Sequence, residues 1–177
     1  MAKIIMGIGI PGAGKTTALK PFAEKNIYTY ISPDDIRAEL TGDASDQSKN
    51  KEVWQEAYRR VAESLERGET VVFDATFAKD FERKNFIQFA REHGAEKVQG
   101  VFASVDFKVA NGRNKARDRV VPEHAIDKMH TMLRDRPPVV EDGFDSVFDI
   151  NELQELERAE IKIEDQIVAR EFKPKLR

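Results

Sequence analysis

A glycine-rich segment near the N-terminus ends in residues that could bind a phosphate. Residues 9–16 read Gly-Ile-Pro-Gly-Ala-Gly-Lys-Thr and fit the pattern G-x-x-x-x-G-K-[ST]. The glycines let successive backbone N–H groups point inward around an anion, and the start of a following helix adds the positive end of its dipole. Lys15 can reach the β- and γ-phosphates of a nucleotide, and the Thr16 hydroxyl can coordinate Mg²⁺. The segment therefore predicts a nucleoside triphosphate site whose binding residues are Gly12, Ala13, Gly14, Lys15, Thr16 and Thr17.

A second candidate site is the segment Ser-Pro-Asp-Asp-Ile-Arg at residues 32–37. Asp34 and Arg37 are three residues apart, so a helix would place both side chains on one face. The carboxylate could accept the proton of an attacking hydroxyl group while the guanidinium binds a phosphate of the acceptor. A capping acid with a helical ion pair would show the same spacing, and the spacing alone does not separate the two interpretations.

Two further polar groups follow other apolar runs. Val71-Val72-Phe73 leads into Asp74, which could contact Mg²⁺ or orient an arginine, although an acid that ends a strand is also common in turns. Arginines placed over a nucleotide could neutralise the transferred phosphoryl group and exclude water. On the protein surface the same charges would form a solvated face. The cations concerned are Lys108, Arg113, Lys115, Arg117 and Arg119.

The elements that must position these groups alternate between strand and helix. Apolar, β-rich runs predict five buried strands, at residues 3–8, 27–31, 71–73, 98–103 and 146–150. The clearest helical pattern covers residues 47–67, where four apolar residues recur four apart. Alternation of this kind indicates a parallel α/β sandwich, in which the carboxyl ends of the strands converge on the ligand.

Length and composition limit the possible functions. A chain of 177 residues with 34% charged residues suits one globular domain. The net charge of −3 gives no overall attraction to nucleic acid or anionic membrane, so any basic site must be local. The absence of cysteine excludes disulfides, thiolate metal sites and cysteine nucleophiles. No apolar stretch approaches membrane-spanning length, and we expect a cytoplasmic protein.

Three other groups of residues receive structural interpretations. Trp54 and Tyr58, four residues apart on the long predicted helix, are expected to pack in the core rather than to stack on bases. The three histidines show no spacing typical of metal ligands. The acids near the last predicted strand are expected on solvated turns, and they are Glu141, Asp142, Asp145 and Asp149.

The quoted segments together resemble the kinase module of polynucleotide 5′-kinases, which include the phage end-healing enzyme and related bacterial RNA-repair kinases. The similarity runs from GIPGAGKTT through SPDDIR, VVFDATFAKDFERK and RNKARDRVVP to about Leu133, roughly three quarters of the chain. The first motif occurs in all P-loop enzymes. The D-x-x-R and R-N-x-x-R patterns are much more selective in combination.

The resemblance implies one P-loop kinase domain over residues 1–177. We expect a five-stranded parallel sheet of order 2-3-1-4-5 with helices on both faces. An arginine-rich lid would lie at about residues 113–121 and a C-terminal helix at about 151–170. The cofactors would be ATP and Mg²⁺, and the acceptor would be the 5′-OH of a DNA or RNA oligonucleotide. By the same resemblance, Asp34 would be the general base on that hydroxyl and Arg37 would hold the neighbouring phosphate.

The resemblance also implies roles on the nucleotide side. Lys15 and Arg117 would stabilise the ATP phosphates in the transition state, and Thr16 would bind Mg²⁺. Asp74 would support the metal or the arginine. Arg113 matches the first arginine of the lid motif, and we include it among the nucleotide-binding residues.

Two other functions remain open. The scaffold could phosphorylate a small molecule such as a nucleoside, a sugar or an antibiotic, which the net negative charge mildly favours. It could instead be a nucleotide-dependent switch with slow ATP hydrolysis, although a switch would not need the Asp34–Arg37 pair.

Relatives commonly carry asparagine two residues after the third-strand aspartate, where this chain has Thr76 followed by Phe77. The choice between DNA and RNA and the oligomeric state do not follow from the sequence.

Overall fold

The computed structural model describes residues 1–153, 155 and 156. The helix expected at about residues 151–170 therefore lies mostly outside the described residues, which include only 151–153, 155 and 156 of that range. Within the described residues, no helix has both the length and the apolar character needed to cross a bilayer.

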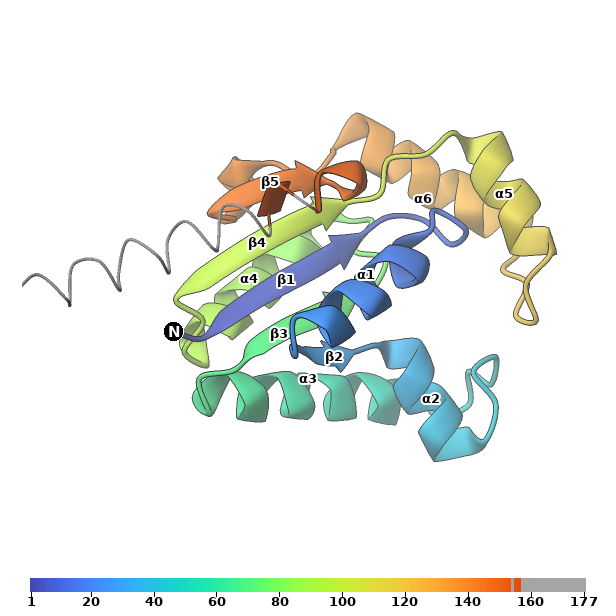
Figure 1. Ribbon diagram of the computed structural model, residues 1–177. Helices are drawn as coiled ribbons and strands as arrows, with labels where there is room; N and C mark the ends of the chain where they lie inside the picture. The colour runs from blue at the N-terminus through green and yellow to red at the C-terminus, as the bar shows by residue number, and fades with distance from the viewer. Residues whose placement is uncertain (154, 157–177) are drawn as a thin grey trace, which may run out of the picture.

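Five strands in the described part of the chain form one sheet (Figure 1). Neighbouring strands pair in parallel in the order β2-β3-β1-β4-β5, so the predicted order is confirmed. The second strand is shorter than predicted because Ile27 adopts a positive φ of 58° in the turn that ends the first helix. The strands are β1 (Lys3–Ile8), β2 (Thr29–Ile31), β3 (Thr70–Asp74), β4 (Lys97–Phe102) and β5 (Ser146–Asp149).

Helices cover both faces of the sheet, as predicted. Figure 1 shows α1 in front of the sheet and α4 behind it. The buried hydrophobic residues of α3, α4 and α6 belong to one cluster, and those of α1 belong to the other. The α-helices of the described residues are α1 (Lys15–Lys25), α2 (Pro33–Thr41), α3 (Asn50–Glu66), α4 (Asp80–Glu92), α5 (Phe107–Lys115) and α6 (Glu123–Asp135), and short 3₁₀ turns occupy η1 (Val140–Asp142) and η2 (Ile150–Glu152).

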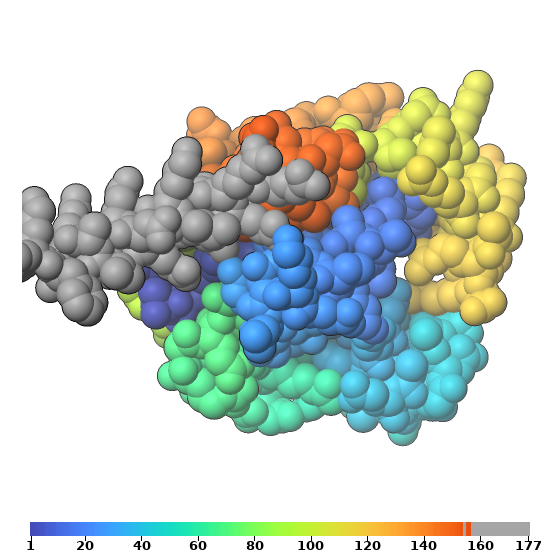
Figure 2. Space-filling model, viewed as in Figure 1, coloured from blue at the N-terminus to red at the C-terminus, as the bar shows by residue number. Residues whose placement is uncertain are grey.

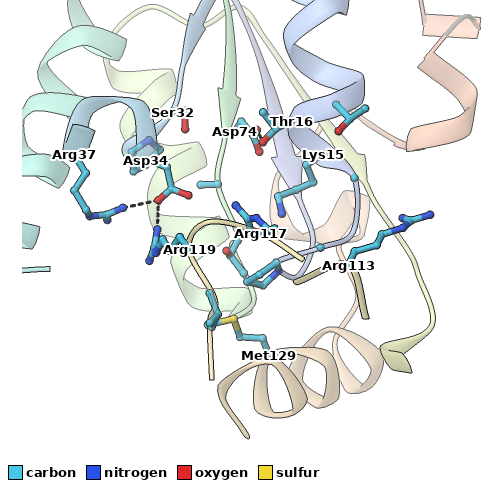
Figure 3. Close-up of a pocket in the computed structure, with 18 of the residues that line it drawn as sticks. Lys15, Thr16, Ser32, Asp34, Arg37, Asp74, Arg113, Arg117, Arg119 and Met129 are labelled. Atoms are coloured by element: carbon cyan, nitrogen blue, oxygen red, sulfur yellow. Dashed lines mark hydrogen bonds and ion pairs between the residues drawn. The ribbon is translucent and has the colours of Figure 1, made fainter. Parts of the chain in front are cut away.

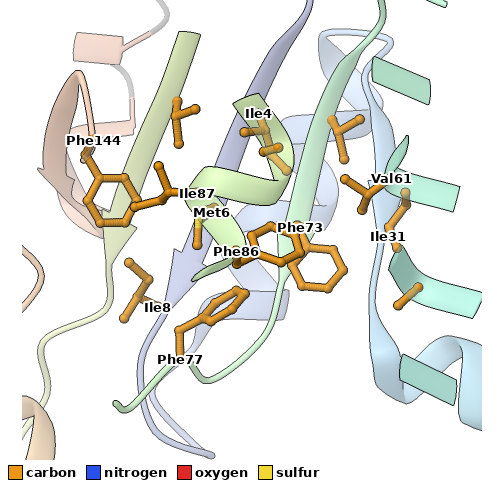
Figure 4. Close-up of a cluster of buried hydrophobic side chains, with 14 of the residues drawn as sticks. Ile4, Met6, Ile8, Ile31, Val61, Phe73, Phe77, Phe86, Ile87 and Phe144 are labelled. Carbon is orange, nitrogen blue, oxygen red and sulfur yellow. The ribbon is translucent and has the colours of Figure 1, made fainter. Parts of the chain in front are cut away.

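Successive side chains of β1 point to opposite faces of the sheet, so this strand contributes to the core on both sides. Ile4 and Met6 pack into the cluster under α3 and α4, whereas Ile5 between them packs against α1. At the centre of the larger cluster, the rings of Phe73 and Phe86 stack with centroids 4.7 Å apart (Figure 4). Burying side chains of this size contributes about 2–3 kcal/mol each, which holds the sheet and helices in fixed register.

The parallel pairing brings the carboxyl ends of the strands to one edge of the sheet. Gly7 pairs with Asp74, and Ile8 pairs with Phe102 at the end of β4. The loop at residues 9–14 leaves β1 at this edge, and α2 begins there directly after β2. The candidate residues, which are far apart in sequence, therefore converge on one edge.

The prediction of a solvated turn is wrong for Asp142. This carboxylate is buried, and its Oδ2 accepts a hydrogen bond of 2.7 Å from Nε of Arg83, whose side chain is 0% exposed. The Arg83 guanidinium also donates to the backbone oxygens of Phe77 and Arg136. A charge buried this deeply needs a counter-charge, and the sequence does not reveal that Arg83 is buried.

Candidate active site

The phosphate-binding loop lies between β1 and α1, where the motif predicts it. Gly12 has a φ of 82°, and a Cβ at this position would come within 2.2 Å of the backbone oxygen of Ala110. Gly14 has a φ of 92° and is the N-cap of α1. Only glycine satisfies the close approach and the left-handed conformation together. Of the predicted loop residues, Ala13 packs in the core and its N–H donates to the Ile10 oxygen, while the others line the cavity described below.

Lys15 opens α1 with its ammonium folded back onto the loop. Its Nζ donates to the backbone oxygens of Gly9 at 2.7 Å and Ile10 at 3.1 Å. Burial lowers the pKa of the Lys15 ammonium, the Asp74 carboxylate opposes that shift, and the Arg117 charge adds to it. A phosphate that enters the loop would supply the negative charge that favours the protonated amine.

Asp74 forms the centre of a short polar network beside Lys15. Its Oδ2 accepts hydrogen bonds from the Thr16 hydroxyl at 2.6 Å and the Tyr30 hydroxyl at 2.7 Å. Burial and the Asp74 charge raise the pKa of Tyr30, so its hydroxyl stays protonated and donates. The aspartate that ends β3 is therefore held against the first turn of α1 rather than used in a turn of its own.

Asp34 and Arg37 form the ion pair that their spacing predicts, and a third residue joins them. Oδ1 of Asp34 accepts hydrogen bonds from Nη1 of Arg37 and from Nη1 of Arg119 (Figure 3). Arg37 is 4% exposed, and its Nη2 donates to the amide oxygen of Asn50 at 3.1 Å. Ser32 occupies the N-cap position of α2, but its side chain makes no capping hydrogen bond.

The arginine-rich segment, residues 113–121, forms part of the wall of the site. Its ends are joined by Asn114, whose side chain donates to the Val121 oxygen at 2.8 Å and accepts from the Val121 N–H at 3.0 Å. Arg113, Arg117 and Arg119 all line the cavity. In contrast, Lys115 pairs with Glu123, so this cation of the cluster lies on the surface.

These residues enclose one cavity of about 470 Å³. Figure 2 shows the surface hollowed between the blue N-terminal segment, the cyan α2 and the yellow segment at residues 113–121. Positive charges outnumber negative ones here although the whole chain carries −3, so the basic site is local, as the composition requires. The charged lining residues are Lys15, Arg37, Arg113, Arg117 and Arg119 against Asp34 and Asp74.

Several residues of the site carry no clear sign of their role in the sequence. Arg119 stands in the basic cluster, but no local pattern shows that it pairs with Asp34. Asn50 and Trp54 reach the cavity from the first turns of α3, where the helical stripe by itself indicates only a core-facing surface. Tyr30 lies on a short strand, and its bond to Asp74 depends on how β2 is placed beside β3.

A family model described as an AAA domain matches residues 4–135, which is most of the chain. The chain belongs to this family. The match includes the phosphate loop, the Asp34–Arg37 pair, Asp74 and the arginine-rich segment. The family match, the strand order and the phosphate-binding loop together identify the chain as a P-loop kinase domain that binds ATP.

Solved structures share this fold at low sequence identity. A chain of the Pnkp1/Rnl/Hen1 RNA repair complex is 20% identical, with a TM-score of 0.68 over 81% of this chain and 46% of its own length. Shikimate kinase from Bacteroides thetaiotaomicron is 22% identical, with a TM-score of 0.58 over 89% of this chain and 97% of its own. A gluconokinase from Sinorhizobium meliloti is 21% identical, with a TM-score of 0.55 and coverages of 88% and 87%. This chain thus spans about half the length of the repair-complex chain, and the likeness concerns the fold.

Proposed function

We propose that this protein transfers the γ-phosphoryl group of ATP to the 5′-hydroxyl of DNA or RNA. The proposal rests on one observation. A carboxylate, Asp34, and a buried arginine, Arg37, line the same cavity as the phosphate loop. A hydroxyl and a neighbouring phosphate on one acceptor are the two groups that this pair would bind.

On the nucleotide side, the loop amides and Lys15 would bind the β- and γ-phosphates. Arg117 lines the cavity and would neutralise charge on the transferred phosphoryl group, and Arg113, which also lines it, would contribute to nucleotide binding. Thr16 and Asp74 present oxygen atoms, the ligands that Mg²⁺ prefers, and would hold the metal directly or through water. When bound, Mg²⁺ would neutralise charge on the phosphates.

On the acceptor side, the two oxygens of Asp34 would have different tasks. Oδ1 accepts from Arg37 and Arg119, which fixes the orientation of the carboxylate. Oδ2 would accept the proton of the attacking hydroxyl as its oxygen bonds to the γ-phosphorus and the bond from that phosphorus to the leaving ADP breaks. Because the bond between Arg119 and Asp34 connects the arginine-rich segment to α2, that segment would close the cavity over both substrates and exclude water.

A small acceptor is the second candidate function, because a cavity of about 470 Å³ lies within the range of small-ligand sites. Shikimate kinase and gluconokinase, whose solved structures have this fold, are small-molecule kinases by name. Such an acceptor would use Asp34 in the same way and would pair its own anionic group with Arg37 or Arg119.

The deciding experiment follows label from [γ-³²P]ATP in the presence of Mg²⁺. The acceptors are DNA and RNA oligonucleotides with 5′-hydroxyl ends, the same strands with 5′-phosphates as blocked controls, and a panel of nucleosides, sugars and small hydroxy acids. We expect label on the 5′-hydroxyl strands and none on the blocked strands. Label on a small molecule alone would replace the proposed acceptor, and ATP hydrolysis without any labelled acceptor would indicate a nucleotide-dependent switch.

A further inference from the structure

A second cavity opens beside the first, between α3 and α6, with a volume of about 630 Å³. Trp54, Thr76 and Met129 line both cavities, so the two cavities adjoin at these side chains. We call the second cavity the α3–α6 groove. The lining residues used below are Trp54, Tyr58, Asn85, Lys128, Met129 and Met132.

The walls of the groove are aromatic and thioether surfaces. The Trp54 ring lies against Phe73 of the core, with centroids 6.3 Å apart, and 6.4 Å from the Tyr58 ring. Both side chains are only partly buried, so each packs on the core and also lines the groove. Met129 and Met132 face them from α6. Flat rings and polarisable sulfur atoms suit a planar aromatic ligand.

The rim of the groove offers polar groups. Lys128 on α6 and Asn85 on α4 are exposed, and the hydrogen bonds and ion pairs of the described residues include neither side chain. The other lysine of the rim, Lys79, is paired with Glu82 at 2.8 Å. Lys128 is therefore available to a phosphate, and the Asn85 amide could bind the edge of a base.

We propose that the α3–α6 groove binds an unpaired nucleobase next to the 5′ end of the acceptor strand. This inference rests on the proposed function and adds a specificity to it. A base inside a duplex must be unpaired and unstacked before it can enter a pocket. The enzyme therefore prefers single-stranded 5′ ends over blunt duplex ends. The groove, and not the net charge of the chain, supplies the affinity for bases.

The first test compares acceptors with the full-length protein. The kcat/KM is measured on a single-stranded 5′-hydroxyl oligonucleotide, on its blunt duplex, and on strands with one abasic site at the first, second or third nucleotide or near the 3′ end. We expect one abasic site among the first three nucleotides to lower kcat/KM by about 5- to 150-fold, the range for losing one stacked base. The abasic site near the 3′ end has no effect, and the blunt duplex is the poorer substrate.

The second test uses variants of the groove. Asn85→Trp fills the groove from an exposed position, and Lys128→Ala removes the cation at the rim. Lys51→Ala, at an exposed position of α3 outside the groove, is the matched control. Both groove variants lower kcat/KM on the intact strand, while the control does not. The same variant is then measured on the strand with the abasic site that lowers kcat/KM. There Asn85→Trp causes no further decrease in kcat/KM, because that strand has no base for the new tryptophan to displace.

The possible failures are distinguishable. If the wild-type protein labels no oligonucleotide, both the proposed function and the groove inference fall. If it labels intact, abasic and blunt-ended strands equally well, the proposed function stands and the groove inference is overturned. An Asn85→Trp variant that slows intact and abasic strands to the same extent would show a structural effect and would also overturn the inference.

Discussion

Replacing Asp142 by asparagine is expected to lower the free energy of unfolding by about 3–5 kcal/mol, the range for a buried charge that loses its partner. The magnitude follows from the surroundings of Arg83, which is 0% exposed and bonded to Asp142 through Nε at 2.7 Å. Asparagine keeps the shape and can still accept this hydrogen bond through its amide oxygen. The other partners of Arg83 are backbone oxygens, which do not neutralise its charge.

The assay is urea unfolding, with the slope of free energy against denaturant as a check on two-state behaviour. Asp135→Asn is the matched control, because Asp135 pairs with Arg134 on the surface, where both side chains are more than half exposed. Loss of such an exposed pair costs at most about 1 kcal/mol. If Asp142→Asn fell within that range, Arg83 would have access to another counter-charge and the account of this buried pair would be refuted.

The remaining predictions concern the active site. Asp34→Asn should lower kcat by about 10²- to 10⁴-fold with little change in ATP binding, measured by steady-state kinetics and calorimetry, because it removes the base but keeps an acceptor for Arg37. Lys15→Ala should instead weaken ATP binding as well, and an unchanged Kd would contradict its role. Gly12→Ala should abolish ATP binding through its clash with Ala110, whereas Gly112→Ala, with open space at its Cβ, should not. Tyr30→Phe should raise the Mg²⁺ concentration needed for half-maximal activity, with kcat at saturating Mg²⁺ retained, since Asp74 loses one of its two donors.

Much of the site could be predicted from local patterns. The glycine spacing places Lys15 and Thr16 at the start of α1, and the three-residue spacing places Asp34 beside Arg37 on α2. The interpretation of Trp54 and Tyr58 as core residues describes only one side of each ring, because both also line the groove. A helical stripe indicates which face turns inward, but it does not show whether that face meets another helix or a cavity.

The sequence by itself determined the alternation of strands and helices, the phosphate loop and the residues that a helix places side by side. These features depend on backbone periodicity and on glycine's freedom to adopt positive φ, which act over a few residues. Only the tertiary structure decided that Arg119 meets Asp34 across 85 residues and that Arg83 meets Asp142 across 59. Such pairs form where packed elements and loops bring distant charges together, and their strength depends on burial that arises only once the whole chain has folded.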